Sequence, residues 1–200
     1  FAPDSTWFAR ARGGALRFST YCSASFVSSS GLVMTNHHCG RESINKVSRE
    51  GENLLDTGFY ARSLQEERKV EDLFVEQLIT IRDITEEVYS AVPPGASSMR
   101  GADVRRQRAE ALEKRYTVEA KDRDSSLTVQ VISLYNGGKY AAYTFRKYED
   151  VRLVLAPELK LGFFGGDYDN FTYPRYSLDM SFFRVYGEDG KPLTPEHWFP

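Results

Sequence analysis

Residues 22–39, CSASFVSSSGLVMTNHHC, decide the fold. Small polar and apolar residues alternate at the start of this stretch, the cluster Ser28–Gly31 interrupts them, and apolar residues resume at Leu32. Short alternating runs on either side of a Ser/Gly cluster predict a β-hairpin. The second strand runs out at Thr35–Cys39 (TNHHC), where two of the three histidines and one of the two cysteines stand together. The end of this hairpin is therefore the first place to look for chemistry.

The composition describes a globular, mainly β protein. The 200 residues are 41% hydrophobic and 14% aromatic, which suits a chain with a sizeable core and favours pleated, half-buried surfaces. Twenty-six basic and 28 acidic residues leave a net charge of −2, so there is no electrostatic case for nucleic acid or for an anionic membrane. No run approaches the roughly 18 apolar residues of a membrane span.

The rest of the chain is dominated by predicted strands. Asn136-Gly137-Gly138 is a strong hairpin signal between two strand-like runs. A segment rich in helix formers predicts one surface helix around 101–121, inserted between strands. The predicted strands are 23–27, 32–34, 74–84, 127–135, 139–148, 151–156 and 179–185, and residues 42–66 predict a short helix and loops.

We expect no metal site. Adjacent residues on an extended chain point to opposite sides, so His37, His38 and Cys39 should not converge on one ion, and zinc sites usually draw on spaced ligand pairs. The stretch that begins at Asp167 starts like a calcium loop, but it has Thr172 where that loop needs glycine. Gly165-Gly166 is not followed by the Gly-Lys of a phosphate loop.

The hairpin resembles the histidine corner of chymotrypsin-fold serine proteases. In that fold the catalytic histidine immediately precedes a cysteine that is bridged back across the hairpin. The resemblance implies a disulfide between Cys22 and Cys39, which lie 17 positions apart (39 − 22), and it selects His38 as the general base. His37 would point the other way and serve the structure.

An imidazole base needs a buried carboxylate to fix its tautomer, and in this fold that residue opens a strand. Asp179 is followed by alternating apolar residues (DMSFFRV) and fits this description. Asp167 and Asp169 compete, but they sit in a glycine-rich loop with no such strand directly after them. The nucleophile of the fold occupies a G-x-S-G type turn, and the sequence contains no such stretch.

Two long motifs sharpen the resemblance. GLVMTNHHCG (31–40) and FGGDYDNFTYPRYSLDMSFFRVY (164–186) are similar to those of the bacterial dipeptidyl-peptidases of the chymotrypsin clan. These are double β-barrel serine exopeptidases with an inserted helical domain. The resemblance implies that residues 1–200 are an N-terminal portion built on the first, His/Asp-bearing, chymotrypsin-like six-stranded β-barrel. The helical domain and the second barrel with its serine would follow Pro200.

By the same resemblance, Asn170 binds the free α-amine of the substrate, and Phe171 replaces a tryptophan that closes this pocket in many members. The implied function is serine-type dipeptidyl-peptidase activity on peptides with a free N-terminus, without a cofactor, in a periplasmic or secreted bacterial protein that forms a homodimer. With the serine outside the chain, the 200-residue fragment alone should be inactive.

Two other functions compete with this one. A protease-like barrel without a nucleophile could be a peptide- or protein-binding module, and a plain structural β domain is a third reading that leaves both motifs unexplained. The discriminating observation is whether the native reading frame continues past Pro200 into a G-x-S-G segment.

Overall fold

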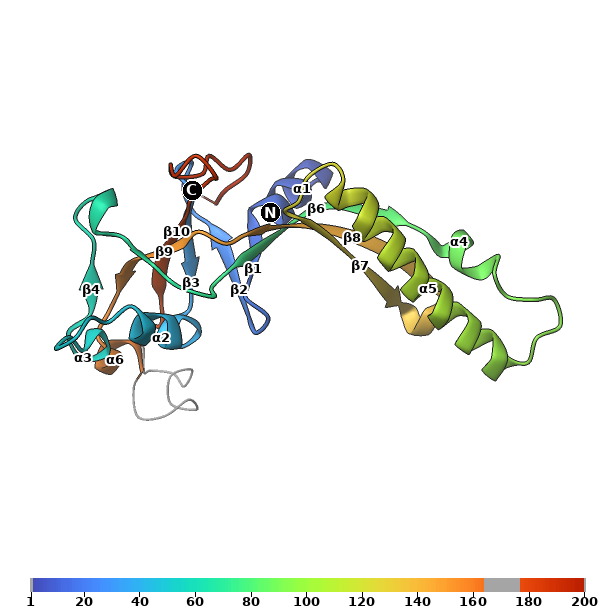
Figure 1. Ribbon diagram of the computed structural model, residues 1–200, viewed down its shortest axis with the longest axis horizontal. Helices are drawn as coiled ribbons and strands as arrows, with labels where there is room; N and C mark the ends of the chain where they lie inside the picture. The colour runs from blue at the N-terminus through green and yellow to red at the C-terminus, as the bar shows by residue number, and fades with distance from the viewer. Residues whose placement is uncertain (1, 164–176, 200) are drawn as a thin grey trace. The chain divides into compact units, whose positions relative to one another are not determined.

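The computed structural model describes residues 2–163 and 177–199. The chain divides into two compact units, unit 1 (Phe1–Gln77 and Tyr148–Pro200) and unit 2 (Leu78–Lys147). In the described part of unit 1 the strands pair antiparallel in the order β4-β9-β10-β3-β2-β1-β6, with β5 paired to β9, and in unit 2 β7 pairs with β8 (Figure 1). The strands are β1 (Ala15–Phe18), β2 (Cys22–Phe26), β3 (Leu32–Thr35), β4 (Phe59–Tyr60), β5 (Arg68–Lys69), β6 (Val75–Asp83), β7 (Leu127–Leu134), β8 (Lys139–Tyr148), β9 (Val151–Ala156) and β10 (Ser181–Val185).

The predicted hairpin of residues 22–39 is confirmed as β2 and β3. Ser28 Oγ accepts hydrogen bonds from the backbone N–H groups of Ser30 and Leu32, both at 3.2 Å, and so closes the turn locally. Gly31 has a φ of 68°, which a side chain would disfavour at this position. The Ser/Gly cluster therefore makes the turn for both chemical and conformational reasons.

Strand β10 brings the C-terminal part of unit 1 against this hairpin. It pairs with β3 in antiparallel register, with Ser181 opposite Thr35. In an antiparallel pair, the residues just before one strand lie beside the residues just after the other. The register therefore places the segment before Ser181 next to the segment that follows Thr35.

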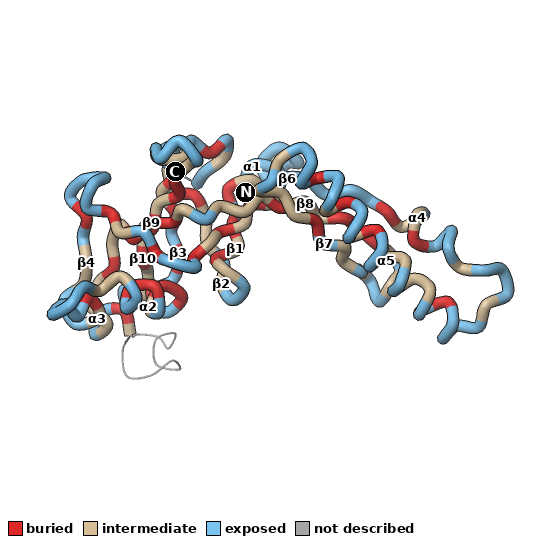
Figure 2. Tube along the Cα trace, in the orientation of Figure 1, coloured by how far each residue is buried: buried red, intermediate tan, exposed pale blue. Residues whose placement is uncertain are grey.

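Apolar side chains of the strands form the core of unit 1, and buried residues follow these strands and α2 (His37–Lys46) in Figure 2. Phe18 and Phe183 are fully buried with ring centroids 5.1 Å apart, which joins β1 to β10 across the core. The pairings among the described residues of unit 1 run as an open path from β4 to β6. The mainly β prediction is confirmed, and the closed six-stranded barrel stays a prediction.

Unit 2 holds the long helix α5 (Ser98–Lys121), which covers the predicted 101–121 helix. Its buried residues Leu112, Tyr116 and Ala120 recur at helical spacing and pack in one cluster with β7 and β8. The hairpin predicted from Asn136-Gly137 is confirmed, with Leu134 opposite Lys139 in the register. No helix within residues 2–163 and 177–199 is both long and apolar enough to span a bilayer.

The remaining helices among the described residues include a short one in the range 42–66, where a short helix was predicted, and others that were not predicted. They are α1 (Ser5–Gly14), α3 (Leu54–Thr57), α4 (Thr85–Tyr89) and α6 (Leu159–Gly162), with short 3₁₀ turns at Leu64–Glu66 and Tyr135–Gly137. Strand β10 begins at Ser181, so Asp179 precedes the strand by two residues and does not open it as expected.

A buried ion pair braces β10. Glu67 accepts hydrogen bonds from Arg184 Nε at 2.9 Å and from the Tyr186 hydroxyl at 2.8 Å. Burial first, and the hydrogen bond to Glu67 second, raise the pKa of Tyr186 to about 12. Because removal of one member of a buried pair leaves its partner uncompensated, Glu67→Leu should lower the free energy of unfolding by about 3–5 kcal/mol in urea denaturation.

Tyr186→Phe is the graded control, because it removes one hydrogen bond and leaves the ion pair in place. This variant should lower the free energy of unfolding by about 1 kcal/mol. A Glu67→Leu variant as stable as Tyr186→Phe would contradict the role of the ion pair.

Candidate active site

Strand β3 leads directly into helix α2, and the residues of TNHHC (35–39) lie at this junction. Asn36 is the N-cap residue and His37 and His38 begin the helix. His37 and His38 point to different surroundings, as expected: the His37 side chain is buried and that of His38 is 42% exposed.

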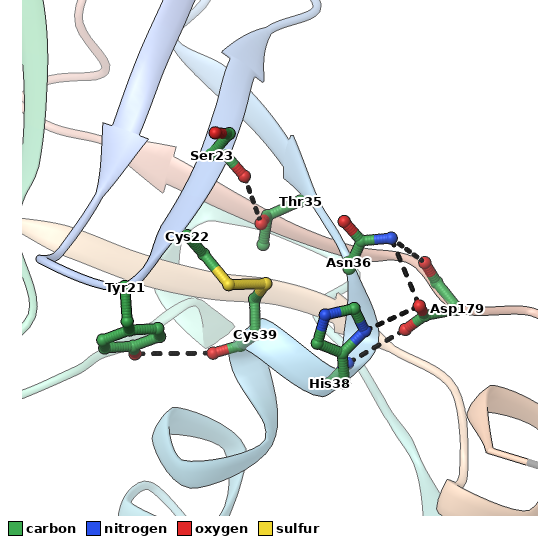
Figure 3. Close-up of a disulfide and its surroundings, with 8 residues drawn as sticks. All are labelled: Tyr21, Cys22, Ser23, Thr35, Asn36, His38, Cys39 and Asp179. Carbon is green, nitrogen blue, oxygen red and sulfur yellow. Dashed lines mark hydrogen bonds and ion pairs between the residues drawn. A yellow bond between two sulfur atoms is a disulfide. The ribbon is translucent and has the colours of Figure 1, made fainter. Parts of the chain in front are cut away.

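His38 and Asp179 are in direct contact, as the β3–β10 register requires. Asp179 Oδ2 lies 2.7 Å from His38 Nδ1, and Asp179 Oδ1 accepts the backbone N–H of His38 at 3.0 Å (Figure 3). The carboxylate holds both the ring and the backbone of one residue, so it fixes the orientation of the imidazole. When Nδ1 carries the proton donated to Asp179, the lone pair of the neutral ring lies on Nε2.

Asn36 is a site residue that the sequence analysis missed. Its Nδ2 donates to Asp179 Oδ2 at 3.2 Å and to the Asp179 carbonyl oxygen at 3.3 Å. Figure 3 shows Asn36 and His38 both facing Asp179, which is only 8% exposed in its side chain. The amide therefore holds the carboxylate in place from a second direction. An Asn directly before the paired histidines, at a strand end, was the available signal.

The predicted disulfide is present between Cys22 on β2 and Cys39 on α2, with Cα atoms 6.1 Å apart. The distance lies within the ordinary range for a disulfide. Thr35 Oγ1, at the end of β3, also donates to the Ser23 carbonyl oxygen at 2.8 Å, so β2 is joined to the end of β3 by this bond and to α2 by the disulfide. The disulfide anchors the residue next to His38, and with it the position of His38.

The expectation of no metal site at His37, His38 and Cys39 stays a prediction. One ligand atom each from Cys22, His38 and Cys39 lie within 4.8 Å of one another. Residues 37–46 are helical and not extended as expected, and Cys22 supplies the third side chain from strand β2. His37 takes no part in this group.

A shallow cavity of about 270 Å³ borders the site. Asn36, Asp179 and Met180 line it on one side, and residues of β2 and β3 line the other. It opens beside the carboxylate of the pair. Asn170 and Phe171, the residues expected to bind an α-amine, lie outside the described residues, as do Asp167 and Asp169.

His37 is buried beneath the site. Its Nε2 lies 3.0 Å from the carbonyl oxygen of Pro157, while its Nδ1 is buried without a hydrogen-bond partner. A Cβ atom on Gly162 would come within 2.6 Å of the His37 ring, so this contact requires glycine. A proton on Nδ1 would have no acceptor there, and burial lowers the pKa of His37 below its ordinary value.

The lowered pKa of His37 predicts a pH-dependent stability. The unfolded chain takes up a proton on this residue near pH 6.5, whereas the folded chain does so only at lower pH. The contribution of the neutral His37 ring to the free energy of unfolding is complete above about pH 6.5. It is lost as the pH falls toward the folded-state pKa of His37. Urea unfolding should show a smaller loss of stability below about pH 6.5 in His37→Gln, whose amide can still donate to Pro157, than in the wild type.

The control is His197→Gln, a histidine substitution away from Pro157 and Gly162. Equal pH dependence in the wild type and in His37→Gln would contradict this account of the buried ring.

An imidazole hydrogen-bonded through Nδ1 to a fixed carboxylate is the base-and-orienter pair of triad hydrolases. The family model described as Peptidase S46 matches residues 1–200. The chain belongs to the peptidase S46 family.

Curated relatives that the chain resembles carry dipeptidyl-peptidase names. The chain is 32% identical over 201 residues to the Asp/Glu-specific dipeptidyl-peptidase of Capnocytophaga gingivalis, covering 94% of this chain and 27% of that protein. It is 34% identical over 189 residues to dipeptidyl-peptidase 7 of Porphyromonas endodontalis, covering 90% of this chain and 22% of that protein. The chain thus spans about a quarter of the length of these curated relatives.

A solved structure agrees with the fold. The crystal structure of Porphyromonas endodontalis DPP11 in complex with the dipeptide Arg-Glu matches with a TM-score of 0.77 and 30% sequence identity. The match covers 94% of this chain and 29% of that chain. The fold and the family therefore agree over nearly all of the residues compared.

Proposed function

We propose that this chain is the base-bearing part of a serine-type dipeptidyl-peptidase, which releases dipeptides from the free N-terminus of peptides. The observation that carries the proposal is the 2.7 Å contact between His38 Nδ1 and Asp179 Oδ2, made by residues 141 positions apart in a peptidase-family chain. The dipeptidyl-peptidase names of the relatives support the substrate class.

In this mechanism His38 acts through Nε2. Asp179 accepts the Nδ1 proton and stabilises the imidazolium that forms when Nε2 takes the proton of the attacking serine. The same nitrogen then returns the proton to the leaving amine, and the acyl-enzyme is hydrolysed by water. The half-exposed ring of His38 suits a group that must meet a nucleophile from another part of the protein.

The remaining parts of the proposal extend beyond the described residues. The serine lies outside this chain, on a second barrel that packs beside the first, and a helical domain is inserted between them. Asn170 and Phe171 hold the substrate α-amine, which sets the distance to the scissile bond at two residues. The protein is periplasmic or secreted and dimeric, and it needs no cofactor.

The test is dipeptide release by a full-length protein that carries this chain, assayed on matched dipeptidyl reporters with free and acetylated N-termini. We expect release only from the free amines. Equal cleavage of both reporters would contradict amine recognition. A protein that binds the free-amine peptides without cleaving them would be the peptide-binding module instead.

A further inference from the structure

Two sulfur atoms lie beside the ring of the proposed base. The Sγ atoms of Cys22 and Cys39 and one ring nitrogen of His38 are mutually within 4.8 Å. Figure 3 shows the His38 ring between the disulfide and the Asp179 carboxylate. Cys39 is buried, Cys22 is half-buried and His38 is exposed, so the group opens to solvent on the imidazole side.

Cysteine thiolates and a histidine nitrogen are ligands that zinc prefers, and this group would offer both once the disulfide is reduced. A tetrahedral site with Zn–S bonds of about 2.3 Å and Zn–N bonds of about 2.0–2.1 Å has neighbouring ligands about 3.6–3.8 Å apart. From the observed arrangement, the nitrogen would approach by up to about 1 Å and the sulfurs would separate once their bond is broken. With Cα atoms 6.1 Å apart, rotation of the two cysteine side chains is enough for this separation.

The hydrogen bond from His38 to Asp179 gives an independent reason to expect metal binding by His38. A histidine that binds a metal through one nitrogen usually donates the other N–H to a carboxylate, which fixes the ring and raises its basicity. His38 Nδ1 already lies 2.7 Å from Asp179 Oδ2, and Asn36 holds that carboxylate. The tautomer that this contact favours places the lone pair on Nε2, which is the form that a metal requires.

We propose that the dithiol form of this protein binds a zinc-class divalent cation through Cys22, Cys39 and His38, and that the disulfide keeps this site closed. Opening the site requires a reductant. With a phosphine, the disulfide and one water give two thiols and the phosphine oxide. Binding of the cation then displaces the two thiol protons, and water fills the fourth position.

The site would control the proposed base. A cation on His38 Nε2 occupies the lone pair that must accept the serine proton, so the metal-bound form cannot act as a general base. Oxidation of the two thiolates by a small-molecule disulfide, which takes up the two electrons and leaves as two thiolates, re-forms the Cys22–Cys39 bond, releases the ion and restores the ring. This consequence rests on the proposed function, whereas binding of the metal does not.

The direct test uses Co²⁺ as the probe on the full-length protein, reduced with a phosphine under argon. We expect thiolate-to-cobalt charge-transfer absorption with one ion per chain, lost on addition of Zn²⁺, and no such absorption in the oxidised protein. His38→Ala should weaken binding at least about tenfold, while the control His197→Ala should bind as the wild type does. Cys22→Ser should abolish the charge-transfer band.

Two results would overturn the proposal: no band in the reduced wild type, or equal affinity in His38→Ala and the wild type, since thiols alone would then hold the ion. If reduction loosens the structure, near-UV circular dichroism must recover with Zn²⁺ in the wild type and not in His38→Ala; failure to recover also counts against the site. An activity assay separates the two proposals, because binding without any dipeptide release under oxidising conditions would reject only the proposed function.

Discussion

His38→Ala in the full-length protein should lower kcat/KM for dipeptide release by about 10⁴-fold or more. Among the described residues, only the His38 ring offers an imidazole that is hydrogen-bonded to Asp179. No neighbouring side chain is therefore expected to take over the proposed role of His38 as the base. The loss should appear in kcat, because the serine loses its proton acceptor in the transition state while substrate contacts elsewhere are unchanged. Steady-state kinetics on a free-amine dipeptidyl reporter measures this.

His197→Ala is the matched control for that variant. It removes a histidine of the same unit that has no contact with Asp179, and its kinetics should stay close to those of the wild type. A His38→Ala protein that retains a tenth or more of the wild-type kcat, with its circular dichroism unchanged, would show that another group is the base.

Asp179→Asn should cost about 10⁴-fold in kcat with little change in shape. The substituted amide can present its NH₂ group to His38 Nδ1, which would then accept a hydrogen bond and leave the proton on Nε2. A ring in that tautomer cannot take a proton from serine. The predicted loss therefore comes from the wrong tautomer and not from a missing side chain.

Asp189→Asn provides the control, since Asp189 accepts the Lys191 N–H in a turn and does not contact the pair. Asn36→Ala should give an intermediate loss of kcat, because it removes one hydrogen bond to the Asp179 carboxylate and leaves the His38 contact in place. A wild-type kcat in Asp179→Asn would show that Asp179 has no role in the reaction.

Local patterns in the sequence predicted the elements that local chemistry determines. The hairpin of residues 22–39 follows from Ser28–Gly31, where side-chain hydrogen bonds and one left-handed glycine make the turn. The hairpin at Asn136-Gly137 follows in the same way, since both residues adopt positive φ. In each case the deciding residues lie within the turn itself.

The helix α1 was missed although its start carries a signal. Asp4 accepts the backbone N–H of Trp7 at 2.8 Å, which is an ordinary N-cap contact. The helix α2 was missed because Asn36 follows a clear strand without a turn residue, and its side chain is committed to Asp179 instead of to the helix.

The contact between His38 and Asp179 could not be derived from local pattern. His38 and Asp179 are 141 positions apart, and their contact depends on the register of β3 against β10, which the sequence does not state. The family resemblance suggested the pair, and the register supplies its physical cause. Asn36 was missed because its role exists only once Asp179 has been placed beside it.

The most direct test of the central claim compares dipeptide release by the 200-residue chain with that by a longer protein that contains it, on the same free-amine reporters. The account predicts activity in the longer protein alone, lost in His38→Ala, because the chain supplies the base and its carboxylate but not the nucleophile. Dipeptide release by the pure 200-residue chain that depends on His38 would contradict this division of the catalytic groups.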